Sequence, residues 1–180
     1  QELELMGAGC PGYSGTESAV LANAYSSLNR SERFTGSAGS AQMVSEALAP
    51  GVFAFVASDA KELNAKGGAA ATSAGLIVGS TASLLIETML NRRLNSQVLA
   101  LARKATSKPL TYAVNTSAHG DHSFGNMYLS PVTTIIQHLN TKNYVDRHLE
   151  DDKAFMIKNF GAGRGIEPIK ARSGDVLLSP

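Results

Sequence analysis

The chain has 180 residues, of which 43% are hydrophobic and 17% charged, and its formal net charge is +1. This composition is typical of an ordinary folded domain, and no apolar run approaches the roughly 18 residues that span a bilayer. Basic residues are scattered among acidic ones and tryptophan is absent, so neither a phosphate-binding groove nor a base-stacking platform is indicated. We therefore expect neither a membrane nor a nucleic acid as a partner.

Cysteine content indicates the cellular compartment. Cys10 is the only cysteine, so no disulfide can form within the chain, which fits a reducing, cytoplasmic location. The N-terminus lacks a basic region followed by an apolar core, so no uncleaved signal peptide is expected, although a chain that starts at Gln1 could have lost one. Cys10 itself is predicted to lie in a turn, because nothing nearby in sequence would lower its thiol pKa.

Residues 1–40 are predicted to form an N-terminal extension. Residues 16–30 place Val20, Leu21, Ala24 and Leu28 at helical spacing, which predicts an amphipathic helix with one apolar stripe. The Gly- and Ser-rich residues 36–40 then predict a flexible link. We expect the helix to contact another subunit; the alternative is that it covers the chain's own core.

Residues 41–180 are predicted to form the main α/β domain. A short helical stretch is expected to end at Pro50-Gly51, before a strand at 52–56 that is rich in β-branched and aromatic residues. Residues 60–74 are small and Gly-rich and predict a loop. Two buried strands at 76–78 and 84–86 come next. A helix at 91–104 and a strand at 110–114 then predict a crossover connection.

The remaining elements are a short helix from 124, a strand at 132–137 that ends at His138, and a strand at 175–178. His148 lies in a polar stretch and is expected to be solvated. The glycine-rich residues 161–165 lack the spacing of a nucleotide-binding loop and predict a flexible loop. Arg164 in this loop is a candidate to contact an anionic or nitro-bearing substrate.

A compact group of polar residues follows the strand at 110–114. His119, Asp121 and His122 form a His-x-Asp-His motif, and imidazole and carboxylate groups at this spacing are suitable ligands for Zn²⁺ or another divalent transition metal. Such an ion acidifies bound water and supports hydrolysis near neutral pH. The alternative is an ordinary turn, since His, Gly, Asp and Ser are common loop residues.

This part of the sequence resembles the metallo-β-lactamase superfamily of metal-dependent hydrolases. The likeness extends over residues 48 to 145, and the matching segments are 73–79, 84–88, 108–116, 119–122 and 135–141. The resemblance implies an αββα sandwich of mixed α/β class and a metal site that contains His119, Asp121 and His122. It also implies that Asp121 orients the attacking nucleophile. His138 and Ser117 are expected to support the metal ligands or to pack beside them without binding the ion. The corresponding loop in the family overlies the metal, so residues 60–74 would form either a mobile lid or a plain surface loop.

The sequence departs from the family pattern in two ways. The family's metal loop is His-x-His-x-Asp-His, and Ser117 stands where the first histidine belongs; a hydroxyl is a poor Zn²⁺ ligand beside imidazole. In addition, 180 residues are fewer than a complete two-halved sandwich generally needs. We therefore expect the N-terminal half of a split sandwich, either as a separate subunit or as one product of a cleaved chain. A second polypeptide would complete it and supply the remaining metal ligands, so we expect a hetero-oligomer.

The predicted function is a metal-dependent hydrolase that is active only with this partner chain. The expected two-chain organisation suggests that the substrate is an activated nitroaromatic methyl ether. The reaction would then be an O-demethylation in nitroaromatic degradation. The alternatives within the family are hydrolysis of another ester, a thioester, a lactone or a β-lactam. A second class remains open, a non-catalytic scaffold subunit with a degenerate metal loop, against which the joint presence of His119, Asp121 and His122 argues.

Overall fold

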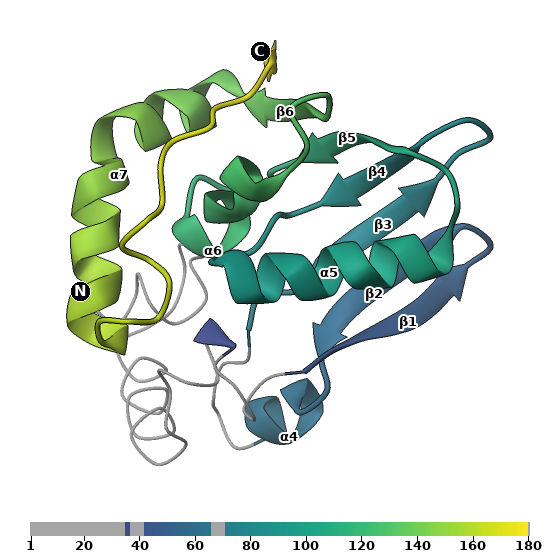
Figure 1. The fold of residues 1–180 in the computed structure, drawn as a ribbon, viewed down its shortest axis with the longest axis horizontal. Helices are drawn as coiled ribbons and strands as arrows, with labels where there is room; N and C mark the ends of the chain where they lie inside the picture. The colour runs from purple at the N-terminus through teal and green to yellow at the C-terminus, as the bar shows by residue number, and fades with distance from the viewer. Residues whose placement is uncertain (1–34, 37–41, 66–70, 180) are drawn as a thin grey trace.

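A computed structural model describes residues 35–36, 42–65 and 71–179 (Figure 1). The predicted helix at 16–30, most of the link at 36–40 and Cys10 lie outside the described residues. The division of the chain at residue 40 therefore stays a prediction.

The described residues form a seven-stranded sheet with helices, which confirms the mixed α/β class. Its strands lie side by side in chain order. The first four strands pair antiparallel and the last four pair parallel, with β4 shared between the two groups. The strands are β1 (Met43–Ala49), β2 (Val52–Ala57), β3 (Ala74–Val78), β4 (Ser83–Ile86), β5 (Leu110–Val114), β6 (Thr134–His138) and β7 (Val176–Leu178).

Two local predictions are corrected by the structure. The stretch before Pro50-Gly51 is strand β1 rather than a helix, because it pairs with β2 in a hairpin and hydrogen bonding along the sheet outweighs local helix preference. Gly51 adopts the left-handed conformation that this turn requires, with φ of 73°. The predicted loop at 60–74 begins with a short helix, α4 (Ala60–Ala65).

The predicted crossover is confirmed. Helix α5 (Arg92–Ala105) connects the parallel strands β4 and β5 and buries Leu94, Val98 and Ala102. It begins at Asn91, whose side-chain oxygen accepts a hydrogen bond from the Leu94 amide at 3.0 Å, the usual way to satisfy a free amide at a helix start.

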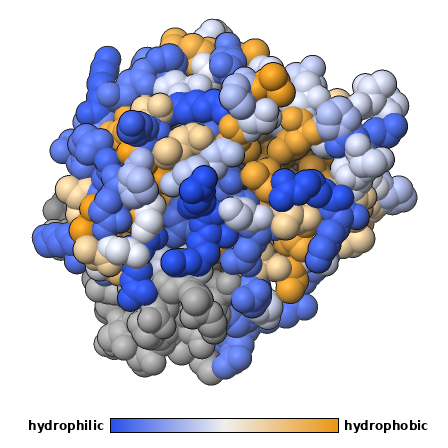
Figure 2. Space-filling model, in the orientation of Figure 1, coloured by the Kyte–Doolittle hydropathy of each residue, from blue (hydrophilic) through white to orange (hydrophobic). Residues whose placement is uncertain are grey.

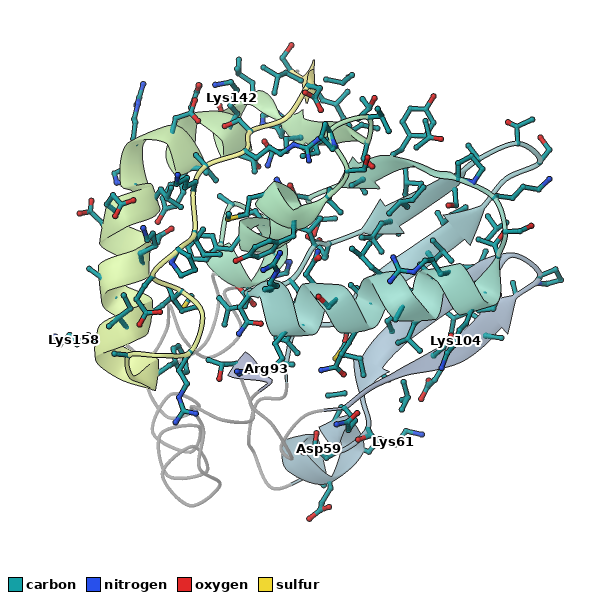
Figure 3. The ribbon with its side chains drawn as sticks, viewed as in Figure 1. Asp59, Lys61, Arg93, Lys104, Lys142 and Lys158 are labelled. Atoms are coloured by element: carbon teal, nitrogen blue, oxygen red, sulfur yellow. The ribbon has the colours of Figure 1, made fainter. Side chains whose placement is uncertain are left out.

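Three further helical elements follow β5. They are α6 (Gly120–Ser123), the 3-10 helix η1 (Phe124–Tyr128) and the long helix α7 (Leu139–Phe160). Lys142 and Lys158 lie near the two ends of α7 (Figure 3). Residues 161–175 return along α7 to strand β7 (Figure 1). No helix among the described residues is long and apolar enough to cross a membrane.

The two faces of the sheet have different environments. On one face, Phe55, Leu76, Leu85, Ala113 and Ile135 are fully buried in the hydrophobic core that includes residues of α5. Because side chains alternate along a strand, their neighbours point to the opposite face. Those neighbours are also apolar, yet several stay exposed, among them Val44, Ile77, Tyr112, Val176 and Leu178. Figure 2, seen from the side of α5, shows further apolar surface around this helix.

Candidate metal site

The candidate site lies at the carboxyl ends of three neighbouring strands. Glu87 directly follows β4, the loop at 115–122 follows β5, and His138 is the last residue of β6. These strands are parallel, so their ends meet at one edge of the sheet, where α/β proteins usually carry their sites. The loop turns into α6 at His119, and Asp121 and His122 lie in the first turn of that helix.

The imidazole of His122 lies between two carboxylates. Its Nε2 is 3.5 Å from Oδ2 of Asp121, and its Nδ1 is 3.3 Å from Oε1 of Glu87. Burial of the ring disfavours its charged form, but the close contact with the Glu87 carboxylate, together with the negative charges of Asp121 and Glu87, outweighs burial and raises the pKa of His122. The His122 ring thus lies between two carboxylates, which favour its protonated form.

Glu87 is the residue that sequence analysis missed. It is buried, and its Oε1 accepts hydrogen bonds from the amide and the hydroxyl of Thr116 in the loop at 115–122. Its contact with His122 suits an ion pair in distance but lacks hydrogen-bond geometry. Glu87 Oε2 and His122 Nδ1 are both buried without a hydrogen-bond partner among the described residues. An acid immediately after a buried strand was the available signal.

Asp121 is held by a residue far away in the sequence. Its carboxylate is buried, and Oδ2 accepts a hydrogen bond from the hydroxyl of Thr72. Thr72 belongs to the predicted loop at 60–74, just before β3. The described end of that loop therefore reaches the candidate ligands, whereas residues 66–70 lie outside the described chain.

His119 lies at the start of α6, beside Ser117. The Ser117 hydroxyl is 3.0 Å from Nδ1 of His119 and also accepts a hydrogen bond from the His119 amide at 3.2 Å. The rings of His119 and His122 have centroids 6.5 Å apart and are tilted by 52°. The carboxyl of Asp152, on α7, lies near His119. Burial raises the pKa of Asp152, whereas a hydrogen bond from Tyr144 and the nearby His119 imidazole act to lower it.

The other two histidines lie apart from this group. His138 begins α7, and its Nδ1 accepts a hydrogen bond from the Asn140 amide at 3.1 Å. None of the hydrogen bonds described for the chain joins His138 to His119, Asp121 or His122. His148 is exposed on α7 and packs against Tyr144, with ring centroids 4.7 Å apart and the rings tilted by 39°, which agrees with the expected solvated position.

The donor set can be tested against a zinc ion. Ligand bonds of about 2.1 Å in tetrahedral geometry place two donor atoms about 3.4 Å apart, and the Asp121–His122 separation of 3.5 Å suits this arrangement. Carboxylate contact with the other ring nitrogen is typical of metal-binding histidines, and Glu87 provides it. His119 stands further off, and the described residues contain no group of three side chains already gathered for metal binding. Asp121 and His122 thus fit one ion, and His119 would have to approach it.

The chain belongs to the metallo-beta-lactamase superfamily. The model of this family matches residues 67–170, more than half of the chain, and spans strands β3 to β6, the loop at 115–122 and the whole of α7. No match was found among curated proteins.

Solved structures give a weaker likeness. The mono-zinc form of the metallo-beta-lactamase FIM-1 from Pseudomonas aeruginosa is 16% identical, with 59% of this chain and 46% of that chain covered and a TM-score of 0.48. DIM-1 metallo-beta-lactamase exposed to ceftazidime is 11% identical, with 76% of this chain and 52% of that chain covered and a TM-score of 0.49. The chain thus spans about half the length of these proteins. At such scores the family assignment rests on the family model.

Proposed function

We propose that this chain is one subunit of a metal-dependent hydrolase in which His119, Asp121 and His122 bind Zn²⁺ or another divalent transition metal. The observation that carries the proposal is the 3.5 Å separation of the Asp121 and His122 donor atoms, with the Glu87 carboxylate behind the imidazole. A bound ion would supply Lewis-acid chemistry and lower the pKa of a coordinated water.

Each side chain has a distinct role in this proposal. Glu87 holds the His122 ring so that Nε2 remains free for a ligand bond. The Thr72 hydroxyl holds one Asp121 oxygen and leaves the other free to orient the nucleophile. Ser117 holds His119 through Nδ1, which leaves Nε2 of that ring for the ion.

The uncovered sheet face supports a second half of the sandwich. Ile77 is 44% exposed and Leu178 is 54% exposed on that face, and a broad apolar sheet surface is normally buried against another element. We propose that a second polypeptide packs its own sheet on this face and supplies the remaining metal ligands. Partner and chain would form a hetero-oligomer, which we place in the cytoplasm.

The substrate proposal is more specific than the fold. A two-chain organisation favours O-demethylation of an activated nitroaromatic methyl ether such as 2,4-dinitroanisole, in which water replaces the methoxy group. Esters, thioesters, lactones and β-lactams are the alternative substrates. In the competing proposal the chain is a non-catalytic scaffold, and the weak oxygen donor at Ser117 is the observation that favours it.

Metal content tests the proposed ligands. His122→Ala should remove most of the zinc and the hydrolytic activity, because it deletes a donor between two acids. His138→Ala is the matched control: it should leave zinc bound and only weaken the start of α7. Elemental analysis of both purified variants decides, and unchanged zinc in His122→Ala would show that the ligand assignment is wrong.

The second half is tested through the exposed sheet face. Alone, the chain should be poorly soluble, and co-expression with the partner should rescue it. Ile77→Asp, which places a charge on the apolar face, should abolish co-purification with the partner, whereas Thr81→Asp in the exposed β3–β4 turn should not. A monodisperse, cooperatively melting monomer of the chain alone would contradict the proposed second half.

A further inference from the structure

The backbone carbonyl of His122 is fixed by hydrogen bonds from two other segments of the chain. Its carbonyl oxygen accepts a hydrogen bond from the Thr88 amide at 2.9 Å and one from the Asn115 side-chain amide, also at 2.9 Å. The Thr88 hydroxyl lies 3.1 Å from the same oxygen, but it is closer to Asn126 Oδ1, at 2.7 Å. The main chain of His122 is thus fixed from the ends of both β4 and β5.

Asn115 is the centre of a buried amide network. Its Oδ1 accepts hydrogen bonds from Asn126 Nδ2 and from Gln137 Nε2, each at 2.8 Å. Gln137 Oε1 in turn accepts the Gly174 amide at 2.7 Å. Asn115, Asn126 and Gln137 are all almost completely buried, so each lost partner would leave a polar group without water.

The hydrogen bonds of the network define the positions of the oxygen and nitrogen atoms of the Asn115 side-chain amide. Two donors converge on its oxygen, so its nitrogen must point to the His122 carbonyl. An aspartate of the same shape at position 115 would place a carboxylate oxygen against that carbonyl oxygen. The contact would change from attraction to repulsion without any change in side-chain volume.

We propose that Asn115 is a positioning residue for the candidate metal ligand His122, and that Gln137 orients Asn115 from β6. The proposal rests on the proposed function, because it assumes that His122 binds metal. Mutation of a residue that hydrogen-bonds to a metal ligand typically lowers metal affinity by about 10–100-fold. Sequence analysis gave Asn115 and Gln137 no role of their own.

The test is a zinc titration of the complex between the full chain and its co-expressed partner, in competition with a chelator of known affinity. Asn115→Asp should weaken zinc binding at least about 10-fold. It should also shift the visible absorption bands of the cobalt(II)-substituted complex, because the His122 donor is displaced. Asn91→Asp is the matched control: Asn91 is equally buried and donates to the carbonyls of Thr35 and Arg164, away from His122. It should lower thermal stability and leave zinc affinity within about twofold.

Each result has a defined meaning. Wild-type affinity in folded Asn115→Asp would overturn the positioning role and leave the proposed function intact. Equal weakening by Asn91→Asp would also overturn it, because the effect would then be one of general destabilisation. A wild-type complex that binds no zinc would overturn the proposed function and this inference together. If Asn115→Asp does not fold, Gln137→Glu takes its place. It removes the donor to Asn115, and unchanged affinity in that variant would refute the proposal.

Discussion

The backbones of Thr88 and Gly125 touch: a Cβ atom on Gly125 would lie 1.7 Å from the carbonyl oxygen of Thr88. The Gly125 amide also donates to the carbonyl of Met89 at 2.7 Å. Thr88 lies between two residues in the left-handed conformation, Glu87 with φ of 63° and Met89 with φ of 74°. This costly backbone brings the turn after β4 directly against the helix that follows the metal loop.

Gly125→Ala should therefore destabilise the chain severely, by more than about 4 kcal/mol, since the clash is with backbone and only a shift of the whole turn relieves it. Gly75→Ala is the control, because its added Cβ meets ordinary contacts at 3.4 Å, and it should change stability by less than about 1 kcal/mol. Urea unfolding of both variants measures the difference. Similar unfolding free energies for the two would show that the turn readily adapts.

Glu87→Gln should weaken zinc binding by on the order of 10-fold. The amide oxygen can still accept the Thr116 hydrogen bond, but the charge beside Nδ1 of His122 is lost, so the ring becomes a poorer donor. Glu46→Gln, on exposed strand β1, is the control that removes the same charge elsewhere. Competition titration with a chelator measures both. Equal zinc affinity in Glu87→Gln and wild type would mean that Glu87 stabilises the loop through Thr116 and does not tune the His122 imidazole.

Ser117→His should add a second metal position. Wild-type Ser117 offers only a hydroxyl, which is engaged with His119, so we expect about one tightly held zinc per site. The new imidazole should raise zinc occupancy and change substrate preference, while Ser117→Ala, which adds no donor, should not. Anomalous diffraction at the zinc edge counts the ions. Two fully occupied ions in the wild-type complex, one of them on Ser117, would contradict the prediction.

Asp146 should make the docking of the C-terminal segment sensitive to acid. Hydrogen bonds from Lys142 and from Ser173 lower the pKa of Asp146, against the small effect of burial. A lowered carboxyl pKa stabilises the fold above the unfolded-state pKa of about 3.9, and this contribution disappears as the pH falls through the folded-state value. Lys142, labelled in Figure 3, lies one turn before Asp146 on α7.

Asp146→Asn should accordingly reduce stability slightly at neutral pH and leave it unchanged in strong acid. Urea unfolding as a function of pH measures this, and the difference from wild type should shrink as the pH drops. Asp151→Asn, which removes another exposed carboxylate of α7 without contact to Ser173, is the control. A difference that grows towards low pH would contradict the predicted sign.

Several elements were predictable because their signals are local. The apolar periodicity of α5, the strands β3 to β5 and the strand β7 follow from residues that are neighbours in sequence. Strand β1 was not predictable in the same way. Its residues Ser45, Glu46 and Ala47 carry no strand pattern, and they are extended because they pair with residues of β2. Pairing energy comes from a partner strand, and no local propensity encodes it.

The sequence by itself determined the family and the candidate ligands, since His119, Asp121 and His122 lie within four residues and their chemistry can be recognised without any fold. Only the tertiary structure decided which residues contact and orient these candidate ligands. Thr72 reaches Asp121 from 49 positions away, and Glu87 reaches His122 because parallel pairing brings the ends of β4 and β5 together. Such contacts depend on strand order and register, which arise when the whole sheet buries its apolar face and cannot be deduced from any single segment.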